Sequence, residues 1–177
     1  MIVTLQSWKK LFLFCFGIAA GTAFCMKWME NDFRVQGQLF TILGLELFYP
    51  REKLAGILSG LDGHVKTILR YHLVFDFVFI AGVYPGIASL CILAKEKVKS
   101  LSLKKLLYIL AVCQLVAWVA DGIENYYLLQ WIEAPQIGEN EFGWYHFIVA
   151  LKWIIIIISL LLAIPLSLKK NKKTVSV

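Results

Sequence analysis

The sequence predicts an all-α fold, a bundle of four transmembrane helices with an outer amphipathic loop and short helix between the first and second of them. Hydrophobic residues make up 59% of the chain, against about 45–50% in a typical soluble domain, and the mean hydropathy is +0.71. Four apolar runs approach the length that crosses a bilayer, and most lysines lie just beyond their ends. We expect the 177 residues to form one integral membrane domain.

Each apolar run is expected to form a membrane-spanning helix. About 20 helical residues cross the roughly 30 Å of hydrocarbon, and lipid offers no hydrogen-bond partner to a backbone that is not helical. The four runs cover residues 11–26, 71–94, 106–130 and 144–168. In the second run, the Tyr84-Pro85-Gly86 step predicts a kink and the close approach of another helix.

The first run has a second interpretation, as a signal peptide. Lys9 and Lys10 precede a short apolar core, and Ala23 would suit a cleavage site. The run continues, however, into Met26 and Trp28, where the tryptophan would anchor a helix end at the membrane interface. This continuation favours a helix that is retained in the protein.

The segment between the first two runs, residues 27–70, is too long for a plain connector. Its stretch LFTILGLELFYP is apolar enough to contact lipid. After Pro50, apolar residues recur at helical spacing, at Leu54, Ile57, Leu58 and Leu61. This spacing predicts a short amphipathic helix on the outer surface.

Charge predicts the orientation in the membrane. Eleven of the 18 lysines and arginines lie on one side of the expected spans, namely Lys9, Lys10, Lys95, Lys97, Lys99, Lys104, Lys105, Lys169, Lys170, Lys172 and Lys173. Positive charge favours the cytoplasmic side. Both termini should therefore be cytoplasmic in a multi-pass protein of the cell membrane, which we expect to be a bacterial inner membrane. The basic tail, residues 169–177, is predicted to be disordered.

Several classes of protein are disfavoured by the composition. The basic residues are not interleaved with exposed aromatics and no nucleic-acid-binding motif is present, so no nucleic-acid partner is expected. The four cysteines lie inside apolar runs and form no CxxC pair, which is typical of buried hydrophobic residues. Three histidines are too few for a His-rich di-iron site. We therefore expect neither a bound metal nor a cofactor.

Polar residues inside the third predicted helix begin the candidate site. Asp121, Glu124 and Asn125 stand at positions i, i+3 and i+4, so that one face of the helix carries all three. Gln114, two turns earlier, shares this face. Hydrocarbon rejects such groups, which indicates that the face meets protein or water.

The second and fourth helices add ionisable groups at a similar depth. His72 and Asp76 stand four residues apart on one face of the second helix, and Lys152 lies in the fourth. If Tyr71 and Trp144 mark the outer interface, Asp76 is roughly 8 Å and Lys152 roughly 12 Å below it. Because an ionisable residue in a membrane helix usually faces a partner or a wet cavity, this arrangement predicts one polar pocket that is open, or nearly open, to the outside.

A purely structural role is the alternative for these residues. Lys152 could pair with Asp121 or Glu124 and join the third and fourth helices, while Asp76 could bond to His72. One lysine cannot, however, neutralise three carboxylates. The remaining acids must be protonated, hydrated, paired with the histidine or matched by a cationic ligand.

The stretches FDFVFIAGVY and ADGIEN resemble patterns in an uncharacterised family of small bacterial four-helix integral membrane proteins. The matching residues are Asp76, Asp121, Glu124 and Asn125, and the resemblance covers about half of the chain; it implies the fold and topology, not an activity. Lipoprotein signal peptidase is similar in size and layout, with an aspartate pair, but its N-x-x-D-R motif is absent here. The His72-x-x-x-Asp76 spacing resembles the EXPERA family of sterol-binding proteins and isomerases, whose wider signature is also absent.

The leading hypothesis from these residues is a binding protein for an amphipathic or cationic small molecule or a lipid. Asp76, Asp121 and Glu124 would supply negative charge, Asn125 hydrogen bonds and Lys152 internal balance. The alternative is an intramembrane lipid-modifying or aspartyl-type enzyme, because unequal burial could divide two carboxylates into a general acid and a general base. A proton-linked transporter and an accessory subunit that docks a partner membrane protein are further alternatives.

Thiol labelling in sealed cells checks the orientation. Cysteines introduced at Ser59 and Gly138 should react with a membrane-impermeant reagent, and a cysteine at Ser100 should not, because it lies on the side that carries the lysines. Labelling at Ser100 would reverse the orientation.

Overall fold

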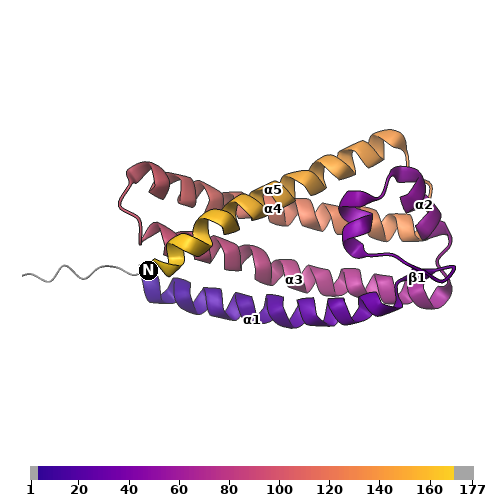
Figure 1. The fold of residues 1–177 in the computed structure, drawn as a ribbon, viewed down its shortest axis with the longest axis horizontal. Helices are drawn as coiled ribbons and strands as arrows, with labels where there is room; N and C mark the ends of the chain where they lie inside the picture. Colours follow the sequence, from indigo (N-terminus) through magenta and orange to yellow (C-terminus); the bar gives the residue numbers. More distant parts are fainter. Residues whose placement is uncertain (1–3, 170–177) are drawn as a thin grey trace, which may run out of the picture.

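The computed structural model describes residues 4–169, which form a bundle of long helices (Figure 1). The long helices are α1 (Leu5–Met29), α3 (Gly63–Lys95), α4 (Leu101–Glu133) and α5 (Glu139–Leu168). Each of the four is long and apolar enough to cross a membrane. The predicted all-α bundle with a linker region between the first two long helices is confirmed, and its architecture is that of a multi-pass membrane protein.

The long helices extend beyond the apolar runs because polar residues cap their first turns. Thr4, Asp62 and Ser100 are the N-cap residues of α1, α3 and α4, and each side chain accepts a hydrogen bond from the backbone amide three residues later. Such caps satisfy amides that have no partner within the helix. The hydrophobic pattern therefore underestimated the helix lengths, because it shows only the part that faces hydrocarbon or the core.

The linker between α1 and α3 is folded. It consists of the 3-10 turn η1 (Glu30–Asp32), the antiparallel strands β1 (Arg34–Val35) and β2 (Gln38–Leu39), the π-helical turn η2 (Gly44–Phe48) and helix α2 (Arg51–Ser59). Gln36 and Gly37 connect the strands with positive φ angles of 51° and 80°. Helix α2 is the amphipathic helix expected after Pro50.

The apolar face of α2 is buried rather than laid on lipid. Its Leu54 and Leu58 belong to a core that also contains Trp131 of α4 and Tyr145 of α5. The linker therefore covers one end of the bundle, beside the ends of α3 and α4 (Figure 1). We call this end of the molecule the loop end.

Helix α1 packs mainly against α3, through small residues. Gly82 and Gly86 stand four residues apart on the face of α3 that meets α1. A Cβ atom at Gly82 would lie 2.9 Å from both the backbone nitrogen of Ala19 and the carbonyl oxygen of Cys15. Such close backbone contact is typical of small residues in membrane helices. The close approach expected near Gly86 is thus made by α1.

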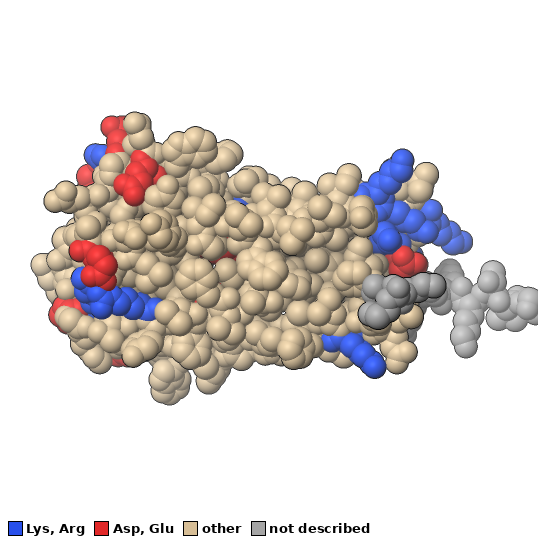
Figure 2. Space-filling view, turned by 180° about the vertical axis from the view of Figure 1, so that it is seen from behind, with Lys and Arg blue, Asp and Glu red and all other residues tan. Residues whose placement is uncertain are grey.

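Most of the described lysines gather at the end of the bundle opposite the linker (Figure 2). We call this end the basic end. It holds the start of α1, the α3–α4 loop and the end of α5, and its lysines are Lys9, Lys10, Lys95, Lys97, Lys99, Lys104, Lys105 and Lys169. The tail predicted to be disordered comprises residues 169–177, and all of it except Lys169 lies outside the described residues. The side of the membrane that the basic end faces stays a prediction.

Gly82→Ala should destabilise the bundle more than Gly86→Ala. At Gly82 the new methyl group meets backbone atoms of α1, whereas at Gly86 the nearest atom is the Cys15 Cβ at 3.3 Å. Overpacking typically costs about 1–3 kcal/mol, so the Tm of the Gly82 variant in detergent should fall by several degrees. Gly17→Ala is the matched control, because nothing lies within 4 Å of that position. Equal Tm values for all three variants would show that this crossing does not hold α1.

Candidate functional site

A buried ammonium group is the centre of the candidate site. Lys152 of α5 is only 4% exposed. Its Nζ donates a hydrogen bond to Asp121 Oδ1 at 2.7 Å and lies 2.5 Å from Glu124 Oε2 and 3.5 Å from Glu46 Oε2. Two carboxyl groups from α4 and one from η2 therefore surround one lysine.

The register of α4 explains why its polar residues meet this lysine. Asp121, Glu124 and Asn125 are 5%, 1% and 2% exposed, as expected for residues that share the inner face. Gln114 lies on the same face and donates a hydrogen bond to the Ser159 hydroxyl of α5 at 2.8 Å. The face deduced from the i, i+3, i+4 spacing is thus the one that packs against the neighbouring helices.

Tyr84 of α3 completes the surroundings of Asp121. Its hydroxyl donates to Asp121 Oδ2 at 2.6 Å, so both oxygens of this carboxylate are engaged, one by the tyrosine and one by Lys152. Sequence reasoning gave Tyr84 a packing role only. The sequence signal that could have placed Tyr84 near the cluster is its spacing, because it lies two turns beyond Asp76 on the same side of α3.

Glu46 is the member of the cluster that sequence reasoning missed. It lies in η2, where Trp153 Nε1 donates to its Oε2 at 3.1 Å. Burial raises the pKa of Glu46, and the nearby Lys152 ammonium acts in the opposite direction. A single acid within the apolar stretch LFTILGLELFYP was the signal that this segment has a polar contact.

The same segment closes the cluster at the loop end. Glu46 reaches Lys152, and the hydroxyl of Tyr145 donates to the backbone carbonyl of Leu45 at 3.3 Å. The expected outward-open pocket is therefore covered in this structure. The reason is that the linker packs its own apolar residues onto the helix ends instead of lying on the membrane surface.

Asp76 stands at the edge of the cluster. It is partly exposed, and its Oδ2 accepts a hydrogen bond from Asn125 Nδ2 at 2.5 Å. Among the described residues, no lysine, arginine or histidine nitrogen lies within 4.0 Å of it. The alternative in which Asp76 bonds to His72 is not what the structure shows.

His72 was expected in the pocket, but it lies apart from the contacts of Lys152. It is 1% exposed, and its ring centroid is 5.3 Å from that of Phe33 in the linker. Neither ring nitrogen has a hydrogen-bond partner among the described residues. The one-turn spacing from Asp76 was therefore misleading, because the carboxylate turns toward α4 and the imidazole packs under the linker.

The cluster holds more negative than positive groups. It contains four carboxyl groups, those of Glu46, Asp76, Asp121 and Glu124, and one ammonium group, so full ionisation would leave a net charge of −3 inside an apolar bundle. Burying unmatched charge costs several kcal/mol per ion. Protons, water or a cationic ligand must balance the excess. In the described part of the chain, no group of three or more His, Cys, Asp or Glu residues is arranged to hold a metal ion.

Comparison of the chain with protein-family models, curated proteins and solved structures finds no match. The similarity to small four-helix membrane proteins accordingly rests on the four long apolar helices.

Removing Lys152 should destabilise the protein, and removing a partner acid as well should restore part of the loss. Lys152→Met strands buried carboxylates, which costs about 3–5 kcal/mol for a buried pair. Adding Asp121→Asn or Glu124→Gln removes one stranded acid, so each double-mutant cycle in detergent should show a coupling of about 0.5–3 kcal/mol.

Glu96→Gln is the control partner in these cycles. Glu96 follows α3 at the basic end, far from Lys152. The change in the free energy of unfolding caused by Glu96→Gln should therefore add to that of Lys152→Met without coupling. Strictly additive losses with both Asp121 and Glu124 would contradict the cluster.

Proposed function

We propose that this multi-pass membrane protein binds an amphipathic or cationic small molecule, or the cationic head group of a lipid, at the acidic cluster. The proposal is carried by one observation: Asp76 is a carboxyl group within the bundle that has a hydrogen bond but no cation. A cationic ligand would supply the missing charge, and its apolar part would remain in a membrane environment.

The members of the cluster differ in their availability to a ligand. Lys152 engages Asp121 and Glu124, which are almost fully buried, and Glu46 also approaches it. Asp76 and Glu46 are the partly exposed acids of the set, and of these two only Glu46 has an ammonium group within 4.0 Å among the described residues. In this proposal Asp76 contacts the cation directly, and Lys152 stays in contact with the three other acids.

Asn125 has a positioning role in this proposal. Its amide donates to one oxygen of Asp76, which leaves the other oxygen to accept from a ligand. A carboxylate held in one orientation loses little freedom on binding. The linker, whose Glu46 lies against Lys152, would cover the bound head group from the loop end.

Binding fits these contacts better than acid–base catalysis. Both oxygens of Asp121 are already engaged by protein groups, so this acid has no free oxygen to exchange a proton with a substrate. A catalytic pair would need both carboxylates within reach of the reacting atoms. Binding needs only the one acid that is available.

Titration with a long-chain quaternary ammonium tests this proposal. Dodecyltrimethylammonium added to protein in dodecyl maltoside micelles should raise the Tm of the wild type, because it binds the folded state. Asp76→Asn keeps the shape and the contact to Asn125 but removes the charge. Its Kd should rise about tenfold or more, since a hydrogen bond to a charged group contributes about 1.5–3 kcal/mol.

Glu96→Gln again supplies the matched control, because it removes one negative charge at the basic end and should leave the Kd unchanged. Equal Kd values for the wild type and Asp76→Asn would refute binding at this carboxylate.

A further inference from the structure

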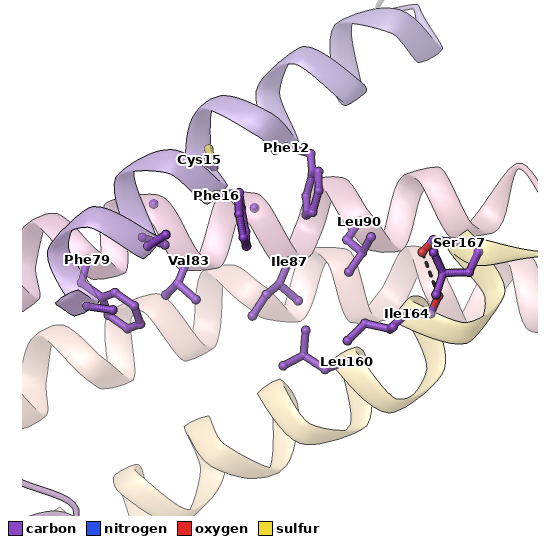
Figure 3. Close-up of a pocket in the computed structure, with 16 residues that line it drawn as sticks. Phe12, Cys15, Phe16, Phe79, Val83, Ile87, Leu90, Leu160, Ile164 and Ser167 are labelled. Atoms are coloured by element: carbon purple, nitrogen blue, oxygen red, sulfur yellow. Dashed lines mark hydrogen bonds between the residues drawn. The ribbon is translucent and has the colours of Figure 1, made fainter. Parts of the chain in front are cut away.

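A long apolar groove lies between α1 and α5, with α3 as its floor (Figure 3). Its volume is about 520 Å³, within the range of about 300–1,000 Å³ found for small-molecule sites. Phe12 and Phe16 of α1 face Leu160 and Ile164 of α5 across it. The groove exists because small residues draw α1 tightly onto α3 while α1 makes little contact with α5.

The groove has the depth of one lipid leaflet. It follows α3 from Phe79 to Leu90, a step of about 16 Å at 1.5 Å per residue. The hydrocarbon of a bilayer is about 30 Å thick, so one leaflet is about 15 Å deep. Its open end, marked by Ser167 and Leu168, reaches the basic end of the bundle.

Lysines lie near this open end. The Lys97 ammonium donates a hydrogen bond to the backbone carbonyl of Ser167, which lines the groove. Lys9 stands three residues before Phe12 and shares its face of α1. Lys10 and Lys169 lie next to these positions and are exposed. Basic pockets between membrane helices are a recognised way to bind anionic head groups.

We propose that this groove is a binding site for one anionic phospholipid of the leaflet at the basic end. One acyl chain fills the groove, and the phosphate group lies beside Lys97 and Lys9. The length of the groove matches the depth of one leaflet, which favours an acyl chain as its occupant. The positive charge at its open end favours an anionic head group. The site does not depend on the proposed function, because its head group lies roughly 30 Å along α3 from Asp76.

Native mass spectrometry tests the groove with two matched pairs of variants. Protein in detergent is titrated with dioleoyl phosphatidylglycerol or dioleoyl phosphatidylcholine. Ala20→Phe fills the groove, and Ala81→Phe puts the same side chain on an exposed surface outside it. The first should reduce the phosphatidylglycerol-bound fraction at least fivefold, and the second should leave it unchanged.

Ile164→Trp and Ile158→Trp form the second pair, in case Ala20→Phe fails to fold. Ile164 lines the groove, and the similarly exposed Ile158 does not. Retention of phosphatidylglycerol by a folded groove variant would overturn the proposed site. The proposal would also be overturned if the wild type forms a dimer that the groove variants abolish, while lipid binding does not change. A second copy of the chain would then be the occupant of the groove.

The head group is tested with lysine variants. Lys97→Gln should reduce the preference for phosphatidylglycerol over phosphatidylcholine at least threefold. Lys99→Gln removes the same charge from the same loop but does not contact the groove, and it should have a smaller effect. Equal binding of both lipids by the wild type would overturn the anionic head group.

Discussion

The ion cluster around Lys152 is the constraint that organises the loop-end half of the molecule. A lysine at the centre of a membrane helix costs about 2.5–3.5 kcal/mol on insertion scales, so its ammonium must be met by protein groups. Asp121 and Glu124 meet it from α4, and Glu46 meets it from the linker. One charge thereby sets how α5 is rotated against α4 and where the linker lies.

The linker can place Glu46 beside Lys152 because its apolar residues pack into a core that it shares with the ends of the long helices. Leu54 and Leu58 of α2 pack with Trp131 and Tyr145 at the helix ends. The indole of Trp153 fixes the Glu46 carboxylate, so that polar and apolar contacts hold the same segment. Within the cluster that this segment covers, Asp76 is the carboxyl group that bonds to Asn125 and has no cation within 4.0 Å among the described residues.

The two ends of the bundle have different chemistry as a result. Buried acids exceed cations at the cluster, while exposed lysines gather at the basic end (Figure 2). Helix α1 contributes no ionisable residue to the cluster and is held instead by the glycines of α3. Because α1 packs closely against α3 and makes little contact with α5, the groove between α1 and α5 stays open.

The sequence by itself determined the spans, helix α2 and the shared face of Asp121, Glu124 and Asn125, because hydrophobicity and helical periodicity are local properties. Only the tertiary structure decided that Glu46 joins the cluster, that the linker covers it and that Asp76 bonds to α4 rather than to His72. Periodicity gives the face on which a residue lies within its own helix. It does not give the rotation of one helix against another, or the segment that folds over their ends, because these depend on contacts between residues as distant in sequence as Glu46 and Trp153.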